Sequence, residues 1–275
     1  MDPLLDRSPD RRSTSSPAPA TRSASSVDLN ADLGEGFAIW QLGDDEALLD
    51  VVTSANVACG GHAGDPATMR RVCLAAAERG VAVGAQVGYR DLAGFGRRRI
   101  DYAFAELRDE VIYQLGALDA FCRVAGTRLR YVKPHGALYN VATVDHTQAA
   151  AVVAAVSEYD ATLPVLCLPG SMLAELAREA GLRPVAEGFA DRGYQADGTL
   201  VPRTASGALV TAAAQVVERA VRMAVEKAVV AVDGTVVPCP VESICLHGDT
   251  PGAVTMARQV RAALLAAGVT LTPFA

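Results

Sequence analysis

Residues 27–33 read VDLNADL, a short run in which apolar and polar side chains alternate. The two-residue period of a β-strand places Asp28, Asn30 and Asp32 together on one face, which in a barrel is the interior. Six further apolar runs, rich in Val, Ile or Leu, have the length and composition of strands. They lie at 53–59, 81–87, 130–136, 164–170, 183–190 and 242–249. The sequence therefore predicts seven strands.

Segments between these runs have the pattern of helices. Asp65 and Pro66 are typical of an N-cap and a first helical residue, and the Ala-rich stretch ATMRRVCLAAAERG that follows ends at Gly80. A glycine ends other Ala-rich stretches in the same way, as a left-handed C-terminal cap requires. These glycines are Gly126, Gly181 and Gly268. Alternation of strand and helix predicts a parallel sheet.

Two architectures fit this order of elements, an open doubly wound sheet and a closed α/β barrel. We favour the barrel, because nearly every strand end carries polar residues, whereas an open sheet concentrates its ligand groups at one switch point. The residues after position 26 are close in number to the roughly 250 of a typical α/β barrel. We expect residues 27–275 to form a single barrel domain.

Two stretches depart from the alternation of strand and helix. Residues 206–230 have a helical pattern, and Asp233 and Gly234 then lie between apolar runs, which predicts a tight hairpin turn. A second Asp-Gly pair, Asp197 and Gly198, marks a turn in a long loop after the sixth predicted strand. Loops of such length are usually functional.

Residues 1–26 are rich in Ser, Pro and Arg and lack apolar periodicity, so we expect a disordered tail. They lack the apolar core of a secretory signal, and no stretch of the chain reaches the roughly 18 apolar residues that span a bilayer. We therefore expect a soluble, cytoplasmic protein without a membrane partner. The net charge of −6 disfavours nucleic acid as a partner.

The six cysteines show no Cys-x-x-Cys pairing, and four of them lie inside predicted strands or helices, where they act as small apolar residues. These four are Cys59, Cys73, Cys122 and Cys167. Neither a disulfide framework nor a zinc knuckle is predicted.

Polar residues at the downstream ends of the predicted strands are too numerous for a packed core and should meet in one cleft. Three of the four histidines, His62, His135 and His247, share this placement. The other residues are Asp28, Asn30, Asp32, Glu35, Asn56, Cys59, Gln86, Tyr89, Lys133, Glu187, Asp191 and Asp249. The sequence thus indicates an enzyme pocket.

Individual groups have a functional and a structural interpretation. Asp28 and Asp32 suit acid–base work or cation binding, but one of them can instead cap a segment or pair with Lys133. Glycines around His62 let the backbone approach a ligand. Lys133 and His135 lie two residues apart, hence on one side of a strand, and can stabilise a developing oxyanion or a phosphate.

His247 and Asp249 repeat this spacing on the last predicted strand, where Asp249 either orients His247 or caps the following helix. His146, behind the N-cap Asp145, is expected at the surface. The chain has neither a phosphate loop nor a dinucleotide-binding fingerprint nor a His-Glu-x-x-His motif. Linear spacing leaves open a metal site built from Asp and His residues of different strands.

Six motifs together resemble one family, LamB/YcsF, which provides the A component of bacterial 5-oxoprolinase. They are VDLNADLGEGF, SANVACGGHAGDP, GFGRR, VKPHGALYN, EGFADRGYQADGTLVPR and CLHGD, and they occur in the family's order from about Val27 onward. The resemblance implies a seven-stranded irregular α/β barrel of the glycoside hydrolase and deacetylase type. It also implies ATP-dependent opening of the cyclic amide 5-oxoproline to glutamate, with magnesium and with B and C partner subunits.

The resemblance further implies roles for the residues of the cleft. Asp32 and His62 are expected in proton transfer, Lys133 and His135 in stabilising charge on lactam or phosphoryl oxygens, and His247 and Asp249 in completing the cleft. Substrate or phosphate contacts are expected from a wider set. That set is Asp28, Asn30, Glu35, Asn56, Gln86, Tyr89, Arg98, Glu187 and Asp191.

The chain departs from this pattern at Gln86, where many relatives have histidine. An amide forms hydrogen bonds but takes no proton at neutral pH, so a general base or an indispensable metal ligand at this position is in doubt. Two other functions remain open. One is metal-dependent hydrolysis or deacetylation of an amide or sugar, and the other is lactam binding without catalysis.

Overall fold

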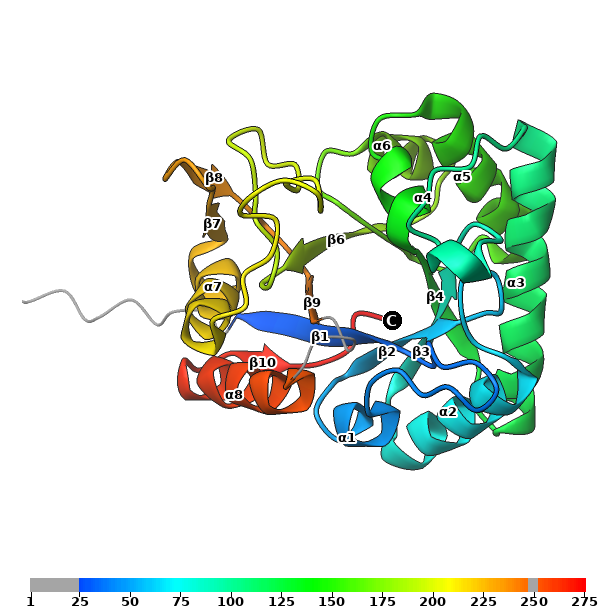
Figure 1. The fold of residues 1–275 in the computed structure, drawn as a ribbon, viewed down its shortest axis with the longest axis horizontal. Coiled ribbons are helices and arrows are strands. Elements are labelled where there is room, and N and C mark those ends of the chain that lie inside the picture. The colour runs from blue at the N-terminus through cyan, green and yellow to red at the C-terminus, as the bar shows by residue number, and fades with distance from the viewer. Residues whose placement is uncertain (1–24, 247–251) are drawn as a thin grey trace, which may run out of the picture.

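The computed structural model describes residues 25–246 and 252–275. Seven parallel strands form a closed barrel, in which each strand pairs with the next and β9 pairs with both β6 and β1 (Figure 1). The strands are β1 (Ser26–Leu33), β2 (Ser54–Ala58), β3 (Ala82–Val87), β4 (Leu129–Pro134), β5 (Val165–Cys167), β6 (Pro184–Phe189) and β9 (Ser243–Leu246). The predicted seven-stranded barrel is confirmed.

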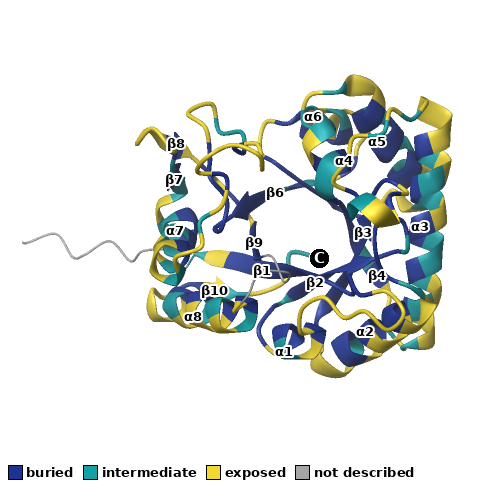
Figure 2. Ribbon diagram, viewed as in Figure 1, coloured by how far each residue is buried: buried dark blue, intermediate teal, exposed yellow. Residues whose placement is uncertain are grey.

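Helices surround the barrel, with their exposed faces outward and the strands buried inside (Figure 2). They are α1 (Asp45–Leu49), α2 (Pro66–Arg79), α3 (Phe104–Val124), α4 (Gly136–Val141), α5 (His146–Asp160), α6 (Met172–Glu179), α7 (Ala213–Glu226) and α8 (Ala253–Ala266), with a 3-10 turn η1 (Leu92–Gly94). The predicted caps of α2 are confirmed, since Asp65 accepts from two backbone amides and Gly80 is left-handed with φ 66°.

The hairpin predicted at Asp233 and Gly234 is confirmed as β7 (Ala228–Val230) paired with β8 (Val236–Pro238). The helix predicted over 206–230 is wrong at both ends, because α7 spans only Ala213–Glu226 and Ala228–Val230 form β7. The segment before it bonds to the loop after β6 instead, through the Gly193 amide to the Ala208 carbonyl and the Val210 amide to the Asp191 carbonyl. These bonds replace those that a helix would provide.

The start of the described chain belongs to the barrel. Ser26 and Val27 pair with the short strand β10 (Thr270–Leu271), so Ser26 lies in β1 rather than in the predicted tail. The rest of that tail lies outside the described residues, apart from Ser25, whose carbonyl accepts from Thr270.

The inner and outer faces of the barrel differ in chemistry. The apolar residues of β1 face outward into the main core, whereas Asp28, Asn30 and Asp32 are buried inside the ring. One end of the interior is filled by the C-terminus, where the Phe274 ring lies 4.8 Å from the Tyr131 ring. Gly84 makes room for Tyr131, because a Cβ there would lie 2.1 Å from its ring. The remaining interior is polar.

Among the described residues, no helix is both long enough and apolar enough to cross a membrane. All six cysteines are buried and free, and the four predicted to act as small apolar residues, Cys59, Cys73, Cys122 and Cys167, lie in the main core.

Candidate active site

The polar interior begins at Asp28, which is held by three hydroxyl groups. The Thr53 and Ser54 hydroxyls each donate to its Oδ1 at 2.6 Å, and the Ser243 hydroxyl donates to its Oδ2. Burial raises the pKa of Asp28 from 3.8 to about 6, although the three hydrogen bonds oppose this shift. This carboxyl therefore changes its protonation state close to neutral pH.

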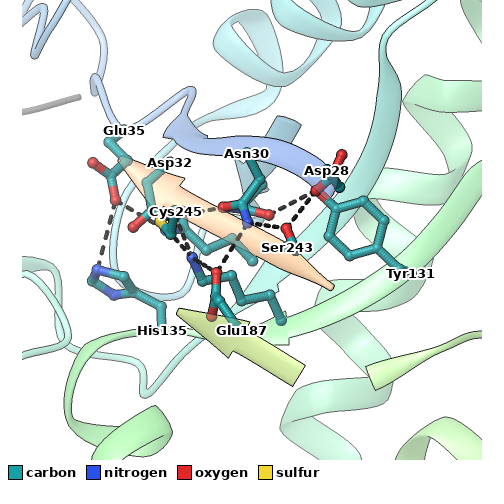
Figure 3. A network of polar contacts seen from close by, with 12 residues as sticks. Asp28, Asn30, Asp32, Glu35, Tyr131, His135, Glu187, Ser243 and Cys245 are labelled. Atoms are coloured by element: carbon teal, nitrogen blue, oxygen red, sulfur yellow. Dashed lines mark hydrogen bonds and ion pairs between the residues drawn. The ribbon is translucent and has the colours of Figure 1, made fainter. Parts of the chain in front are cut away.

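Two buried side-chain amides, those of Asn30 and Asn56, bond to the carboxylates of Asp32 and Glu187. Asn56 donates to the Asn30 carbonyl oxygen at 2.6 Å and to Asp32 Oδ1 at 2.8 Å. Asn30 in turn donates to Glu187 Oε1 at 3.1 Å. Figure 3 shows Asn30 and Asp32 of β1 and Glu187 of β6 directed toward one another. These hydrogen bonds fix the orientation of the Asp32 and Glu187 carboxylates.

Lys133 lies at the centre of this network. Its Nζ is 2.9 Å from Asp32 Oδ1, 2.8 Å from Glu187 Oε1 and 3.1 Å from Cys245 Sγ. Burial alone would lower the pKa of Lys133, but the negative charges around it, Asp32 foremost, hold this pKa well above its ordinary value. The lysine is thus a fixed cation, and the pairing with Asp32 that the sequence left open is present.

A second cluster joins Glu35, His62 and His135. Each histidine Nε2 faces the same carboxylate oxygen, Glu35 Oε1, at 3.7 Å from His62 and 3.6 Å from His135. The two imidazole rings stack with centroids 3.8 Å apart, and all three side chains are buried. Burial and the neighbouring His62 lower the pKa of His135 well below its ordinary value, so its ring is neutral at pH 7.

The loop after β3 forms a wall against the two histidines. The Phe95 ring meets both imidazoles edge-on, with centroids 5.7 Å from His62 and 5.4 Å from His135. Gly96, at φ +64°, lies so close that a Cβ would be 2.6 Å from His62 Cβ. Glycine is therefore required here by both backbone conformation and space.

A small pocket opens beside these clusters. Its lining includes the buried residues Asp32, Lys133, His135 and Arg192 and the exposed Arg203. Its volume of about 30 Å³ leaves room for little more than a water molecule. Burial lowers the pKa of Arg192 only to about 10, so this residue stays charged. Its guanidinium donates to the Ala208 and Val201 carbonyls, which hold the positive charge beside the pocket, and this charge favours an anionic ligand.

The structure brings together most of the site residues that the sequence predicted. These are Asp28, Asn30, Asp32, Glu35, Asn56, His62, Gln86, Lys133, His135 and Glu187. Asp191 is buried just beyond the end of β6. His247 and Asp249 lie outside the described residues, so their predicted roles stay predictions.

Two predicted contact residues lie apart from these clusters. Tyr89 donates from its hydroxyl to Gln148 on α5 at 3.1 Å and stacks on Tyr102. Arg98 pairs with Asp91, the residue that caps η1, and therefore holds a turn. Their roles in substrate binding remain predictions.

Sequence reasoning missed several site residues. Ser243 and Cys245 follow the same two-residue period on β9 as Asp28 and Asn30 on β1, so the period carried a usable signal. Tyr131 precedes Lys133 by two positions and is detectable in the same way. Phe95 and Arg192 lie on loops, where no periodic pattern marks which side chains turn inward.

Comparison with known proteins identifies the family. The LamB/YcsF family model matches residues 27–275. The chain belongs to the LamB/YcsF family. It is 63% identical over 249 residues to the 5-oxoprolinase A subunit of Streptomyces avermitilis, covering 90% of this chain and 100% of that protein. It is 60% identical to the 5-oxoprolinase A subunit of Mycobacterium marinum, covering 90% of this chain and 98% of that protein.

A solved structure agrees with this assignment. The lactam utilization protein from Thermus thermophilus is 43% identical to this LamB/YcsF chain and superposes with a TM-score of 0.87. The match covers 90% of this chain and 100% of that one.

Proposed function

We propose that this LamB/YcsF chain is the A subunit of a 5-oxoprolinase, which opens 5-oxoproline to L-glutamate with hydrolysis of ATP. The observation that carries the proposal is its 63% identity, over the whole length of the relative, to a protein of that name. The two arginines that line the pocket support it, since 5-oxoproline carries a carboxylate.

The chemistry explains why ATP is needed. A five-membered lactam is a resonance-stabilised amide, and its carbonyl carbon is a poor electrophile. Transfer of the γ-phosphoryl group to the lactam oxygen makes that carbon electrophilic. Water then adds to it, the carbon–nitrogen bond breaks with protonation of nitrogen, and phosphate leaves, so the products are glutamate, ADP and phosphate.

The site offers a side chain for each of these reaction steps. Neutral His135 and the adjacent His62 are placed to accept or deliver the protons of water and the leaving nitrogen. Lys133, held between Asp32 and Glu187, supplies a fixed positive charge in the lining of the pocket for oxygens that become negative. Asp32 is directed by Asn56 and Lys133 and can act as a further base.

We propose that B and C subunits complete the enzyme and that magnesium accompanies ATP as co-substrate. The pocket volume of about 30 Å³ is far below the roughly 300–1,000 Å³ of typical ligand sites, which supports a need for partners or movement before substrates bind. We also propose a cytoplasmic location, in keeping with the six free cysteines.

The test is glutamate release from 5-oxoproline by this chain, with and without B and C subunits, ATP and magnesium. We expect turnover only in the complete mixture. His62→Ala should reduce that turnover at least about 100-fold, as loss of a general acid–base group does. His146→Ala is the matched control, because His146 is exposed. Turnover near the wild-type rate in His62→Ala would remove His62 from the chemistry.

The group Glu35, His62 and His135 favours a second candidate, metal-dependent hydrolysis of an amide, because these side chains are suitable metal ligands. The same assay separates the two functions. Turnover that persists without ATP supports plain hydrolysis, whereas strict dependence on ATP excludes it.

A further inference from the structure

We propose that Glu35, His62 and His135 bind a single divalent transition-metal ion, with zinc as the best match. Among residues 25–246 and 252–275, these three form a group in which one ligand atom from each lies within 4.8 Å of the others. Metal binding can be measured on this chain alone, so its test does not depend on the proposed 5-oxoprolinase activity.

The distances within the group fit shared ligands better than hydrogen bonds. The separations of 3.7 and 3.6 Å between the histidine Nε2 atoms and Glu35 Oε1 exceed those of a normal hydrogen bond. Two ligands bound tetrahedrally at about 2.0–2.1 Å from one zinc ion are separated by about 3.4 Å. A small contraction of the cluster around an ion therefore suffices.

The polar atoms of the cluster also point to a ligand. Within the described residues, both nitrogens of His62 and Nδ1 of His135 are buried without a hydrogen-bond partner. Burying such atoms without a partner is costly, and native proteins rarely do so without a reason. A metal ion would satisfy His62 Nε2, which faces Glu35, and would offset the cost of burying two imidazole rings face to face.

Gln86 provides a position for a further ligand. Its Nε2 donates to Glu35 Oε1 at 3.2 Å, while its buried Oε1 has no partner among the described residues. Rotation of this amide by half a turn would bring the carbonyl oxygen toward the same ion. An imidazole at position 86 would reach it as well, so Gln86→His should strengthen binding.

The site lies next to the pocket, because His135 belongs to both. Two histidines and one glutamate with a position left for solvent or substrate form the ligand set of catalytic rather than structural zinc. With an ion bound, the Nε2 atoms of His62 and His135 would serve as ligands in place of proton-transfer groups, which leaves Asp32 as the base. The ion would polarise a carbonyl or phosphoryl oxygen bound in the pocket.

The test uses the tag-free full-length chain, stripped with a chelator and titrated with Zn²⁺ and Co²⁺ by calorimetry and absorption spectroscopy. We expect one ion per chain and a cobalt spectrum of nitrogen and oxygen ligands. Glu35→Gln and His62→Asn should each weaken binding at least about 100-fold, the upper end of what loss of an outer-shell partner costs. Gln86→His should tighten it.

His146→Asn is the control and should bind as the wild type does, because His146 is exposed on α5. Circular dichroism of each variant verifies folding, and the conservative Glu35→Gln keeps a hydrogen-bond acceptor for Gln86. Stoichiometric binding that is unchanged in folded Glu35→Gln and His62→Asn would overturn the proposal. So would a wild-type chain that binds no ion, or a cobalt spectrum dominated by thiolate ligands.

Discussion

Asp28→Asn should change how stability depends on pH. Asp28 is buried among three hydroxyls, and its pKa rises from 3.8 to about 6 on folding. The folded state therefore holds this proton more tightly than the unfolded state. At 1.36 kcal/mol per pKa unit, the shift corresponds to about 3 kcal/mol.

The direction of the effect follows from proton binding. Between pH 3.8 and about 6 the folded state binds more protons than the unfolded state, so this group's contribution to stability falls as pH rises and is constant above that window. Asparagine does not titrate, so relative to Asp28→Asn the wild type should lose about 2.4 kcal/mol between pH 4 and pH 7, since part of the titration lies below pH 4.

Urea denaturation of both proteins at pH 4, 5, 6 and 7 measures this difference. Asp197→Asn is the control, because Asp197 is exposed and its hydrogen bonds to Thr199 lower its pKa, so any pH effect has the opposite sign. An equal stability difference between wild type and Asp28→Asn at pH 4 and pH 7 would refute the reasoning.

Three further predictions concern stability. Lys133→Met leaves Asp32 and Glu187 buried without their cation, so urea denaturation should show a loss of about 3–5 kcal/mol; an unchanged midpoint would contradict this. Gly84→Ala places a methyl group within 2.1 Å of the Tyr131 ring and should cost at least about 1–3 kcal/mol, visible as a lower melting temperature. Asp65→Ala removes the N-cap of α2 and should cost about 1 kcal/mol by the same denaturation, whereas Asp65→Asn should retain most of the stability.

The fold was predictable from sequence because its signals are local and repeated. Alternation in VDLNADL identifies a strand and its inward face, and the left-handed glycines after α2, α3, α6 and α8 mark the ends of those helices, both without reference to distant residues. Closure of the ring was inferred from polar strand ends, and the pairing of β9 with β1 confirms that inference.

The sequence predicted which residues belong to the site, but not which of them contact one another. The two-residue period identified Asp32 and Lys133 as inward-facing, but whether a carboxylate pairs with a lysine or with a histidine depends on barrel stagger, which sequence does not specify. The same limit applies to the stacking of His62 on His135, since these residues come from different loops. The start of α7 was missed because the preceding loop competes for its backbone hydrogen bonds.

The most direct test of the central claim is the rate of ATP-dependent glutamate release by the complete enzyme containing Asp32→Asn. This substitution keeps the size of the side chain but removes the carboxylate that Asn56 and Lys133 hold in place. We predict a loss of at least about 100-fold with circular dichroism unchanged. A folded Asp32→Asn enzyme that releases glutamate at the wild-type rate would contradict the account.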